Sequence, residues 1–211
     1  NFHPDVPFEQ VKAKWGLPQS QYMSCRDYFV HYLDEGPKTK PILILFHGAA
    51  SNLRVWDPWT NLLKNDFRIL RMDMPAFGLS GPALNDNFNY SLYDYAGFTR
   101  SFLECLHLEN ERLFLAGSSL GAGVAWMYAS RWPQNVAGLA LLDSAGIHEF
   151  DMPTHNWTMN FSLRLATYPV LRNVMRYVTP RRFIEKSLHT AVTDPSIVFF
   201  LDFVFFFFSF L

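Results

Sequence analysis

Short apolar runs alternate with segments of helical periodicity between residues 28 and 143. Five runs have the length and composition of strands, and they cover residues 28–33, 42–46, 67–73, 112–117 and 136–143. Three segments between them repeat apolar residues every three or four positions, as amphipathic helices do, at residues 53–64, 91–108 and 120–132. Because strands and helices alternate, we predict an α/β fold with a mostly parallel sheet and helices on both faces.

Individual residues indicate where the predicted helices begin and end. Pro58 falls near the start of the first helix, where a missing N–H is tolerated. Ser91 is the predicted N-cap of the second, because its hydroxyl can accept from an amide of the first turn. The third predicted helix ends before Pro133.

The pattern changes after residue 148, and this change predicts three regions. Residues 1–148 form the core, and residues 149–198 have the amphipathic helical spacing expected of a lid segment. Residues 199–211 contain eight phenylalanines and do not fit such a core. This tail is shorter than the roughly 20 residues that a membrane-spanning helix needs, and Asp202 interrupts it, so the sequence disfavours a membrane segment.

Composition argues against several function classes. The formal net charge of -1 leaves no basic excess to neutralise a phosphate backbone, so we expect no nucleic-acid partner. Cys25 and Cys105 lie far apart and outside any CxxC pattern, so we expect packing residues and neither a disulfide framework nor a zinc site. No spacing implies a metal or another cofactor. The chain opens at Asn1 without a signal-like segment, so its start is processed, incomplete or signal-free, and the cytoplasm is weakly favoured.

A cluster of small residues lies between the fourth apolar run and the third predicted helix. It contains the pattern G-x-S-x-G, formed by Gly117, Ser119 and Gly121. A sharp turn from strand to helix strains its central residue and requires small residues two positions to either side. Ser118 has the bulky Leu120 at one of those positions, so we assign Ser119 as the nucleophile. A glycine-rich helix start without chemistry is the alternative interpretation.

The loop after the second apolar run predicts another part of the same site. Acyl transfer needs backbone N–H donors about 3 Å from the position where the oxyanion forms. The residue after the nucleophile and the small residues after Gly48 are the candidate sources, which gives Leu120 and Ala49, with Ala50 as the alternative to Ala49. We interpret His47 as a residue whose hydrogen bond shapes this turn rather than as a catalytic base.

Four motifs follow one another in a characteristic order and spacing, at residues 42–59, 68–82, 113–123 and 139–147. Together they resemble the α/β-hydrolase superfamily, in particular its lid-bearing branch of esterases and C–C bond hydrolases. The resemblance implies that Ser119 attacks the carbonyl of a small ester or ketone-type substrate, forms an acyl-enzyme and releases it with water. The lid residues that would then line the substrate cavity include Trp157, Phe161, Leu165 and Tyr168.

The resemblance also implies that an acid and then a histidine follow the nucleophile along the chain. Asp143 is the best candidate acid, although a turn or capping role is the simpler interpretation. The histidines on the lid side, each more simply a surface or lid residue, are His148, His155 and His189. We therefore expect a chain that is truncated within or just after its lid.

Two functions stay open at this point. The first is a serine hydrolase that works through an acyl-enzyme on Ser119. The second is a truncated, catalytically defective hydrolase-like protein that lacks the triad histidine and acts at most as a binding or interaction protein. A sheet that ends at its sixth family strand leaves an open edge and an uncovered apolar face, so we also expect self-association through exposed apolar surface.

Overall fold

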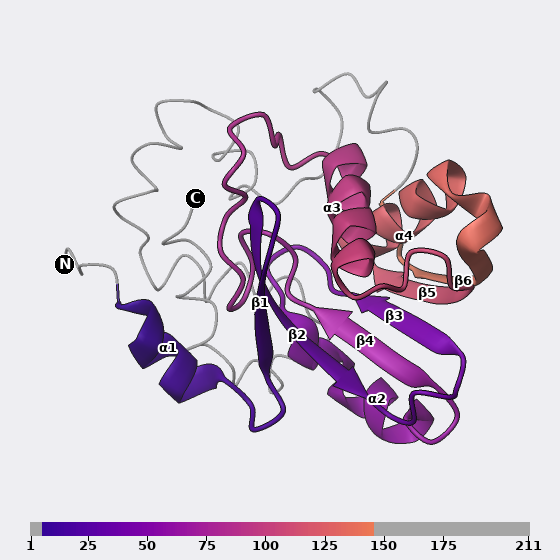
Figure 1. The fold of residues 1–211 in the computed structure, drawn as a ribbon, viewed down its shortest axis with the longest axis horizontal. Coiled ribbons are helices and arrows are strands. Elements are labelled where there is room, and N and C mark those ends of the chain that lie inside the picture. The colour runs from indigo at the N-terminus through magenta and orange to yellow at the C-terminus, as the bar shows by residue number, and fades with distance from the viewer. Residues whose placement is uncertain (1–5, 146–211) are drawn as a thin grey trace. The chain divides into compact units, whose positions relative to one another are not determined.

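The computed structural model describes residues 6–145, which contain a six-stranded sheet (Figure 1). In chain order the strands are β1 (Gln21–Cys25), β2 (Tyr28–Glu35), β3 (Ile42–Phe46), β4 (Arg68–Met72), β5 (Leu113–Ser118) and β6 (Val136–Leu142). Their order across the sheet is β1-β2-β4-β3-β5-β6. β3 runs parallel to β4 and β5, and β5 runs parallel to β6, whereas β2 is antiparallel to β1 and β4. The predicted α/β class with a mostly parallel sheet is confirmed.

The described residues belong almost entirely to one compact unit, which comprises Glu9–Ile147. The predicted lid segment at 149–198 and the phenylalanine-rich tail at 199–211 lie outside the described residues. The division of the chain into core, lid and tail therefore stays a prediction.

Helices lie on both faces of the sheet. The α-helices are α1 (Phe8–Trp15), α2 (Asp57–Leu63), α3 (Leu92–Cys105) and α4 (Leu120–Arg131), and the short 3₁₀ turns are η1 (Leu53–Trp56) and η2 (Pro133–Asn135). α3 and α4 pack side by side, and α4 lies along β5 and β6 (Figure 1). On the face of η1 and α2, Trp56 packs with Leu43 and Leu45 of β3. Within the described part of the chain, no helix is long and apolar enough to cross a membrane.

Helix boundaries follow the residues that the sequence singled out. Pro58 lies in the first turn of α2, so the predicted helix at 53–64 is divided into η1 and α2. Ser91 caps α3, as predicted: its hydroxyl accepts from the Asp94 N–H, and the Asp94 carboxylate accepts from the Ser91 N–H in return. This reciprocal capping box satisfies two amides that the first turn would otherwise leave unpaired.

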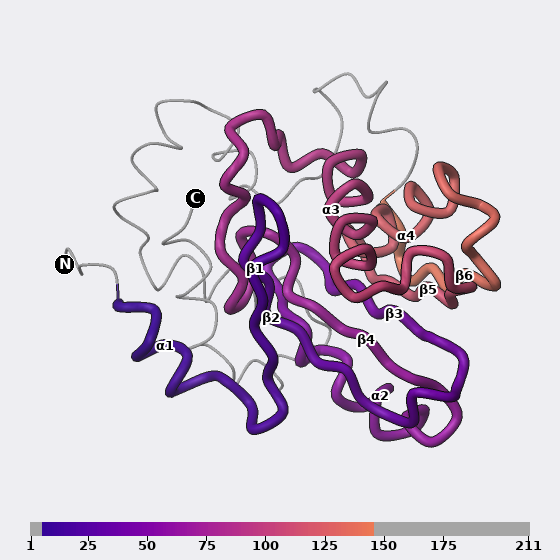
Figure 2. Tube along the Cα trace, viewed as in Figure 1, coloured from indigo at the N-terminus to yellow at the C-terminus, as the bar shows by residue number. Residues whose placement is uncertain are grey.

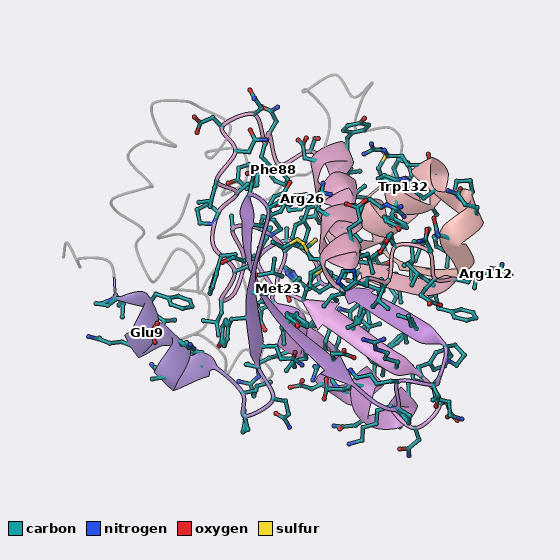
Figure 3. All side chains as sticks on the ribbon, in the orientation of Figure 1. Glu9, Met23, Arg26, Phe88, Arg112 and Trp132 are labelled. Atoms are coloured by element: carbon teal, nitrogen blue, oxygen red, sulfur yellow. A yellow bond between two sulfur atoms is a disulfide. The ribbon has the colours of Figure 1, made fainter. Side chains whose placement is uncertain are left out.

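The loop before α3 lies along the hairpin of β1 and β2 (Figure 2). The Gly81 N–H donates to Phe29 O at 3.2 Å, and the Leu84 N–H donates to Asp27 O at 2.9 Å. Phe88, labelled in Figure 3, belongs to the same loop. Its ring packs edge-on against Tyr28 at a centroid distance of 5.8 Å. These contacts fix a long loop that has no regular secondary structure of its own.

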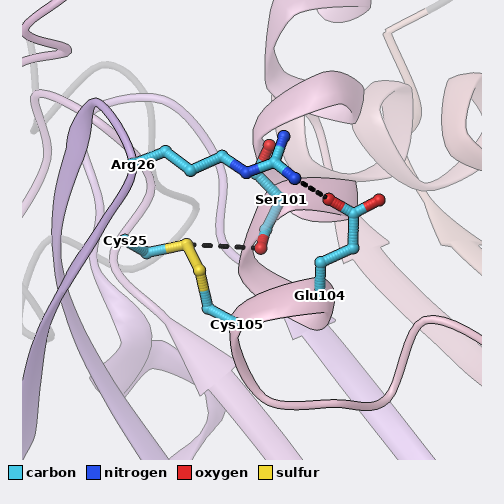
Figure 4. Close-up of a disulfide and its surroundings, with 5 residues drawn as sticks. All are labelled: Cys25, Arg26, Ser101, Glu104 and Cys105. Atoms are coloured by element: carbon cyan, nitrogen blue, oxygen red, sulfur yellow. Dashed lines mark hydrogen bonds and ion pairs between the residues drawn. A yellow bond between two sulfur atoms is a disulfide. The ribbon is translucent and has the colours of Figure 1, made fainter.

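Cys25 and Cys105 form a disulfide, which corrects the expectation that both are packing residues (Figure 4). The bond joins the end of β1 to the end of α3, where the two Cα atoms are 6.1 Å apart although 80 positions separate them in the sequence. An ion pair between Arg26 and Glu104, at 2.6 Å, lies beside it. The sequence could not reveal this pairing, because only the packing of α3 against the hairpin brings the two cysteines together.

The last described strand leaves apolar surface exposed. Among residues 6–145, β6 pairs with β5 alone, and Leu139 and Leu141 are 38% and 45% exposed. Self-association through such a surface stays a prediction.

Candidate active site

Ser119 lies on a strained turn between β5 and α4. Its backbone has φ 52 and ψ -115, a conformation that L-residues rarely adopt. Its N–H donates to Leu142 O at 2.9 Å, and its carbonyl oxygen accepts from the N–H groups of Gly123 and Ala145. Hydrogen bonds with β6, with α4 and with the segment after β6 therefore hold the strained backbone in place, as is typical of functional turns.

Glycines on either side of Ser119 allow the chain to close on itself. A β-carbon on Gly117 would lie 2.5 Å from Ala122 N, and one on Gly121 would lie 2.5 Å from His47 O. Both distances are shorter than any that real β-carbons show, so a side chain at either position would force the turn apart. The chain thus packs β5, α4 and the end of β3 together at backbone contact.

The turn that follows β3 lies against Ser119. A β-carbon on Gly48 would be 3.5 Å from Ser119 Cβ and 3.3 Å from Ser118 O. Ala50, in the same turn, has a positive φ of 55. Within residues 6–145, neither the Ala49 N–H nor the Leu120 N–H donates to a described group. The two predicted oxyanion donors therefore lie on the two segments that meet at Ser119: Ala49 on the turn after β3, and Leu120 at the start of α4.

His47 is buried and bonded at both ring nitrogens. Nδ1–H donates to Gly48 O at 2.8 Å, and Nε2 accepts from the Met74 N–H at 3.1 Å. Burial lowers the pKa of His47 below its ordinary value, against smaller opposing effects of Asp73 and of the bond to Gly48. The ring is therefore neutral at pH 7, and it links the turn after β3 to the loop after β4.

A second buried histidine forms a hydrogen-bonded series that the sequence analysis missed. His31 Nδ1 lies 2.7 Å from Asp73 Oδ2, and His31 Nε2 lies 2.7 Å from Ser20 Oγ. Because a carboxylate only accepts, Nδ1 carries the proton toward Asp73, and Nε2 is bonded to the Ser20 hydroxyl. The available signals were a histidine within an apolar strand and an aspartate directly after another, but nothing in the sequence pairs positions 42 residues apart.

Asp143, the candidate acid, directly follows β6 and has a positive φ of 45. It is adjacent to Leu142, whose carbonyl oxygen accepts from the Ser119 N–H, so it stands at the same edge of the sheet as the nucleophile. Among the described residues, no hydrogen bond joins its carboxylate to Ser119. The lid-side histidines His148, His155 and His189 lie outside the described residues, as do the lid residues Trp157, Phe161, Leu165 and Tyr168.

The described part of the chain offers no evident place for a metal. Between residues 6 and 145, no group of three histidine, cysteine, aspartate or glutamate residues is arranged to hold an ion.

A mostly parallel sheet with helices on both faces, and a serine on a sharp strand-to-helix turn at its rim, define a protein of the α/β-hydrolase class. The family model described as alpha/beta hydrolase fold matches residues 41–185, and the chain belongs to this family.

Known relatives include lipases and esterases. The chain is similar to monoacylglycerol lipase ABHD6 of Bos taurus, with 30% identity over 131 residues, which are 61% of this chain and 38% of that protein. Carboxylesterase CesB of Bacillus subtilis is 26% identical with a TM-score of 0.52, covering 63% of this chain and 45% of that one. Naproxen esterase of Bacillus subtilis shares the fold, at 21% identity, a TM-score of 0.67, and coverage of 98% and 69%. The chain thus spans well under half the length of the ABHD6 relative that it matches.

Proposed function

We propose that this protein is a serine hydrolase of small carboxylic esters that works through an acyl-enzyme on Ser119. The observation that carries the proposal is the strained backbone of Ser119 at the rim of the sheet, beside the turn at Gly48. The lipases and esterases among the relatives favour an ester over a C–C bond as the bond that breaks.

The chemistry assigns a role to each group. Ser119 Oγ attacks the ester carbonyl carbon and loses its proton to a general base, while the carbonyl oxygen becomes an oxyanion. The N–H groups of Ala49 and Leu120 stabilise that oxyanion. The C–O bond to the alcohol then breaks, the alcohol leaves with the proton, and water hydrolyses the acyl group from Ser119 in a second step of the same kind.

The general base must come from a histidine with a free ring nitrogen. His31 and His47 both have each ring nitrogen engaged, so neither can take a proton from Ser119 without breaking an existing bond. His107 is exposed and precedes β5, so it lies at the opposite end of that strand from Ser119. A base from beyond residue 145 is therefore part of the proposal, and Asp143 is the candidate for the acid that orients it.

A hydrolase-like protein that binds but does not turn over is the second candidate function. The observation that favours it is that both ring nitrogens of His31 and of His47 are already hydrogen-bonded, so neither ring is available as a general base. Without a general base, the serine hydroxyl is a poor nucleophile, and residual catalysis would reach only about 10³–10⁴ over water.

Labelling with a fluorophosphonate probe and hydrolysis of p-nitrophenyl butyrate test the proposal. We expect the protein to be labelled at Ser119 and to hydrolyse the ester, the Ser119→Ala variant to do neither, and Ser118→Ala to retain both as the matched control. Hydrolysis that survives in Ser119→Ala would refute the nucleophile assignment. A wild-type protein that is neither labelled nor active would support the second candidate.

A further inference from the structure

Both backbone polar groups of Leu53 are held by buried side chains from the end of β4. Its N–H donates to Asp73 Oδ1 at 2.8 Å, and its carbonyl oxygen accepts from Arg71 Nη1 at 3.3 Å. Asp73 is 1% exposed and Arg71 is 3% exposed. Arg71 is itself fixed by Glu35, at 2.8 Å, and by Asp57. Arg71, in β4, and Asp73, directly after this strand, therefore hold the two backbone polar groups of one residue in a clamp.

This clamp secures one end of the segment that carries a proposed oxyanion donor. We refer to residues 47–53 as the donor segment, because Ala49 lies within it. His47 secures its start through the bond from the Met74 N–H, and Leu53 secures its end through Asp73 and Arg71. Since the donor must lie about 3 Å from the oxyanion, a shift at either end would weaken its bond to the transition state.

His31 orients the carboxylate that makes this clamp. Asp73 Oδ2 accepts from His31 Nδ1–H at 2.7 Å and from the Leu79 N–H at 2.8 Å, which leaves Oδ1 directed at the Leu53 N–H. The position of His31 is fixed in turn by Ser20 at its other nitrogen and by stacking on Tyr22, at a centroid distance of 4.9 Å. A continuous series of hydrogen bonds thus runs from Ser20 to the donor segment.

We propose that His31 is a positioning residue for catalysis: through Asp73, its Nδ1–H holds the donor segment where Ala49 can reach the oxyanion. The inference rests on the proposed function for its kinetic consequence. Loss of the Nδ1–H donor lowers kcat by about tenfold or more, because misplaced groups lose transition-state stabilisation, while KM changes little. The structure of the donor segment depends on His31 whether or not the protein is an enzyme.

Two substitutions separate this role from simple packing. His31→Asn retains an N–H donor near the position of Nδ1 but removes most of the ring. His31→Phe retains the ring that stacks on Tyr22 but removes the donor. Positioning through Asp73 predicts that His31→Asn preserves kcat and His31→Phe loses it, whereas a packing role predicts the reverse order. Val30→Ala is the matched control, because Val30 is fully buried on the same strand and, as the neighbour of His31 in that strand, directs its side chain to the opposite face of the sheet.

The experiment measures kcat and KM for p-nitrophenyl butyrate, together with hydrogen–deuterium exchange of the Leu53 amide, in the full-length protein. We expect the Leu53 amide to exchange at least tenfold faster in His31→Phe than in the wild type. In His31→Asn and Val30→Ala its exchange rate should stay near that of the wild type. Unchanged exchange in His31→Phe would overturn the proposal, as would retention of kcat by His31→Phe and loss by His31→Asn. If the wild type hydrolyses no ester, the proposed function fails, and the exchange rates alone decide whether His31 braces the donor segment.

Discussion

The backbone of Gly121 lies directly against the carbonyl oxygen of His47, so that a β-carbon on Gly121 would stand 2.5 Å from that oxygen. This approach brings the first turn of α4 to the end of β3 and sets the spacing between Ser119 and the donor segment. A glycine is therefore required for steric reasons, independently of any role in catalysis.

Gly121→Ala should lower the free energy of unfolding by about 2–4 kcal/mol, because the added methyl group must displace backbone rather than a side chain. Gly123→Ala, two residues further along α4, is the control. Its β-carbon would meet Leu92 Cδ2 at 2.8 Å and Ala145 Cβ at 3.3 Å, which are side-chain rather than backbone atoms, and alanine gains about 1 kcal/mol of helix propensity. Urea denaturation compares the two variants, and equal losses would contradict the steric argument.

Gly78 lies directly against the Asp73 carboxylate, which leaves no room for a β-carbon there. Its φ is +54, and a β-carbon there would overlap Oδ2 and lie 2.6 Å from Oδ1. We expect Gly78→Ala to cost about 2–3 kcal/mol and to turn the carboxylate away from Leu53 and His31. Gly81→Ala, in the same loop, should cost little, because its β-carbon would meet only Phe29 Cβ at 3.9 Å. Thermal unfolding separates the pair; a Gly78→Ala variant as stable as Gly81→Ala would contradict this prediction.

The disulfide between Cys25 and Cys105 should contribute strongly to stability, because it closes a loop with a sequence separation of 80. Chain-entropy arguments give about 4.5 kcal/mol for a loop of this length. Urea denaturation with and without dithiothreitol should show this loss, and the Cys25→Ser, Cys105→Ser double variant should be insensitive to the reductant. Mass spectrometry after alkylation checks the bond itself: two alkylated cysteines in the untreated protein would refute it.

The strands of the core could be predicted from the sequence because they are apolar runs with turns at both ends. Residues 42–46 form β3, in which all five residues are buried between the helices on the two faces. The order β2-β4-β3 could not be predicted, because pairing depends on the path of the crossovers rather than on the composition of a run. α1 and β1 were missed for a different reason: each has a single buried residue, Val11 in α1 and Cys25 in β1, so neither shows an apolar run or stripe.

The candidate site also has features that the sequence could predict and features that it could not. The turn at Ser119 could be predicted because its glycines lie two positions to either side of it in the sequence. The bond between His31 and Asp73 joins positions 42 apart on neighbouring strands, and the disulfide joins positions 80 apart. Long-range pairs of this kind leave no local pattern, so they become visible only once β2 and β4 are placed side by side and α3 is packed on the hairpin.

His47 should make the stability of the fold depend on pH. Burial lowers its pKa in the folded state below the ordinary 6.5, so between the two values the unfolded chain binds a proton that the folded protein does not. The stability that the neutral His47 ring contributes to the folded state is fully present above pH 6.5 and is lost as the pH falls toward the folded-state pKa. Between pH 7.5 and pH 5, the free energy of unfolding should fall less in the His47→Gln variant than in the wild type, as measured by urea denaturation. Equal pH dependence in the two proteins would show that His47 does not carry this effect, since glutamine cannot take up a proton at this position.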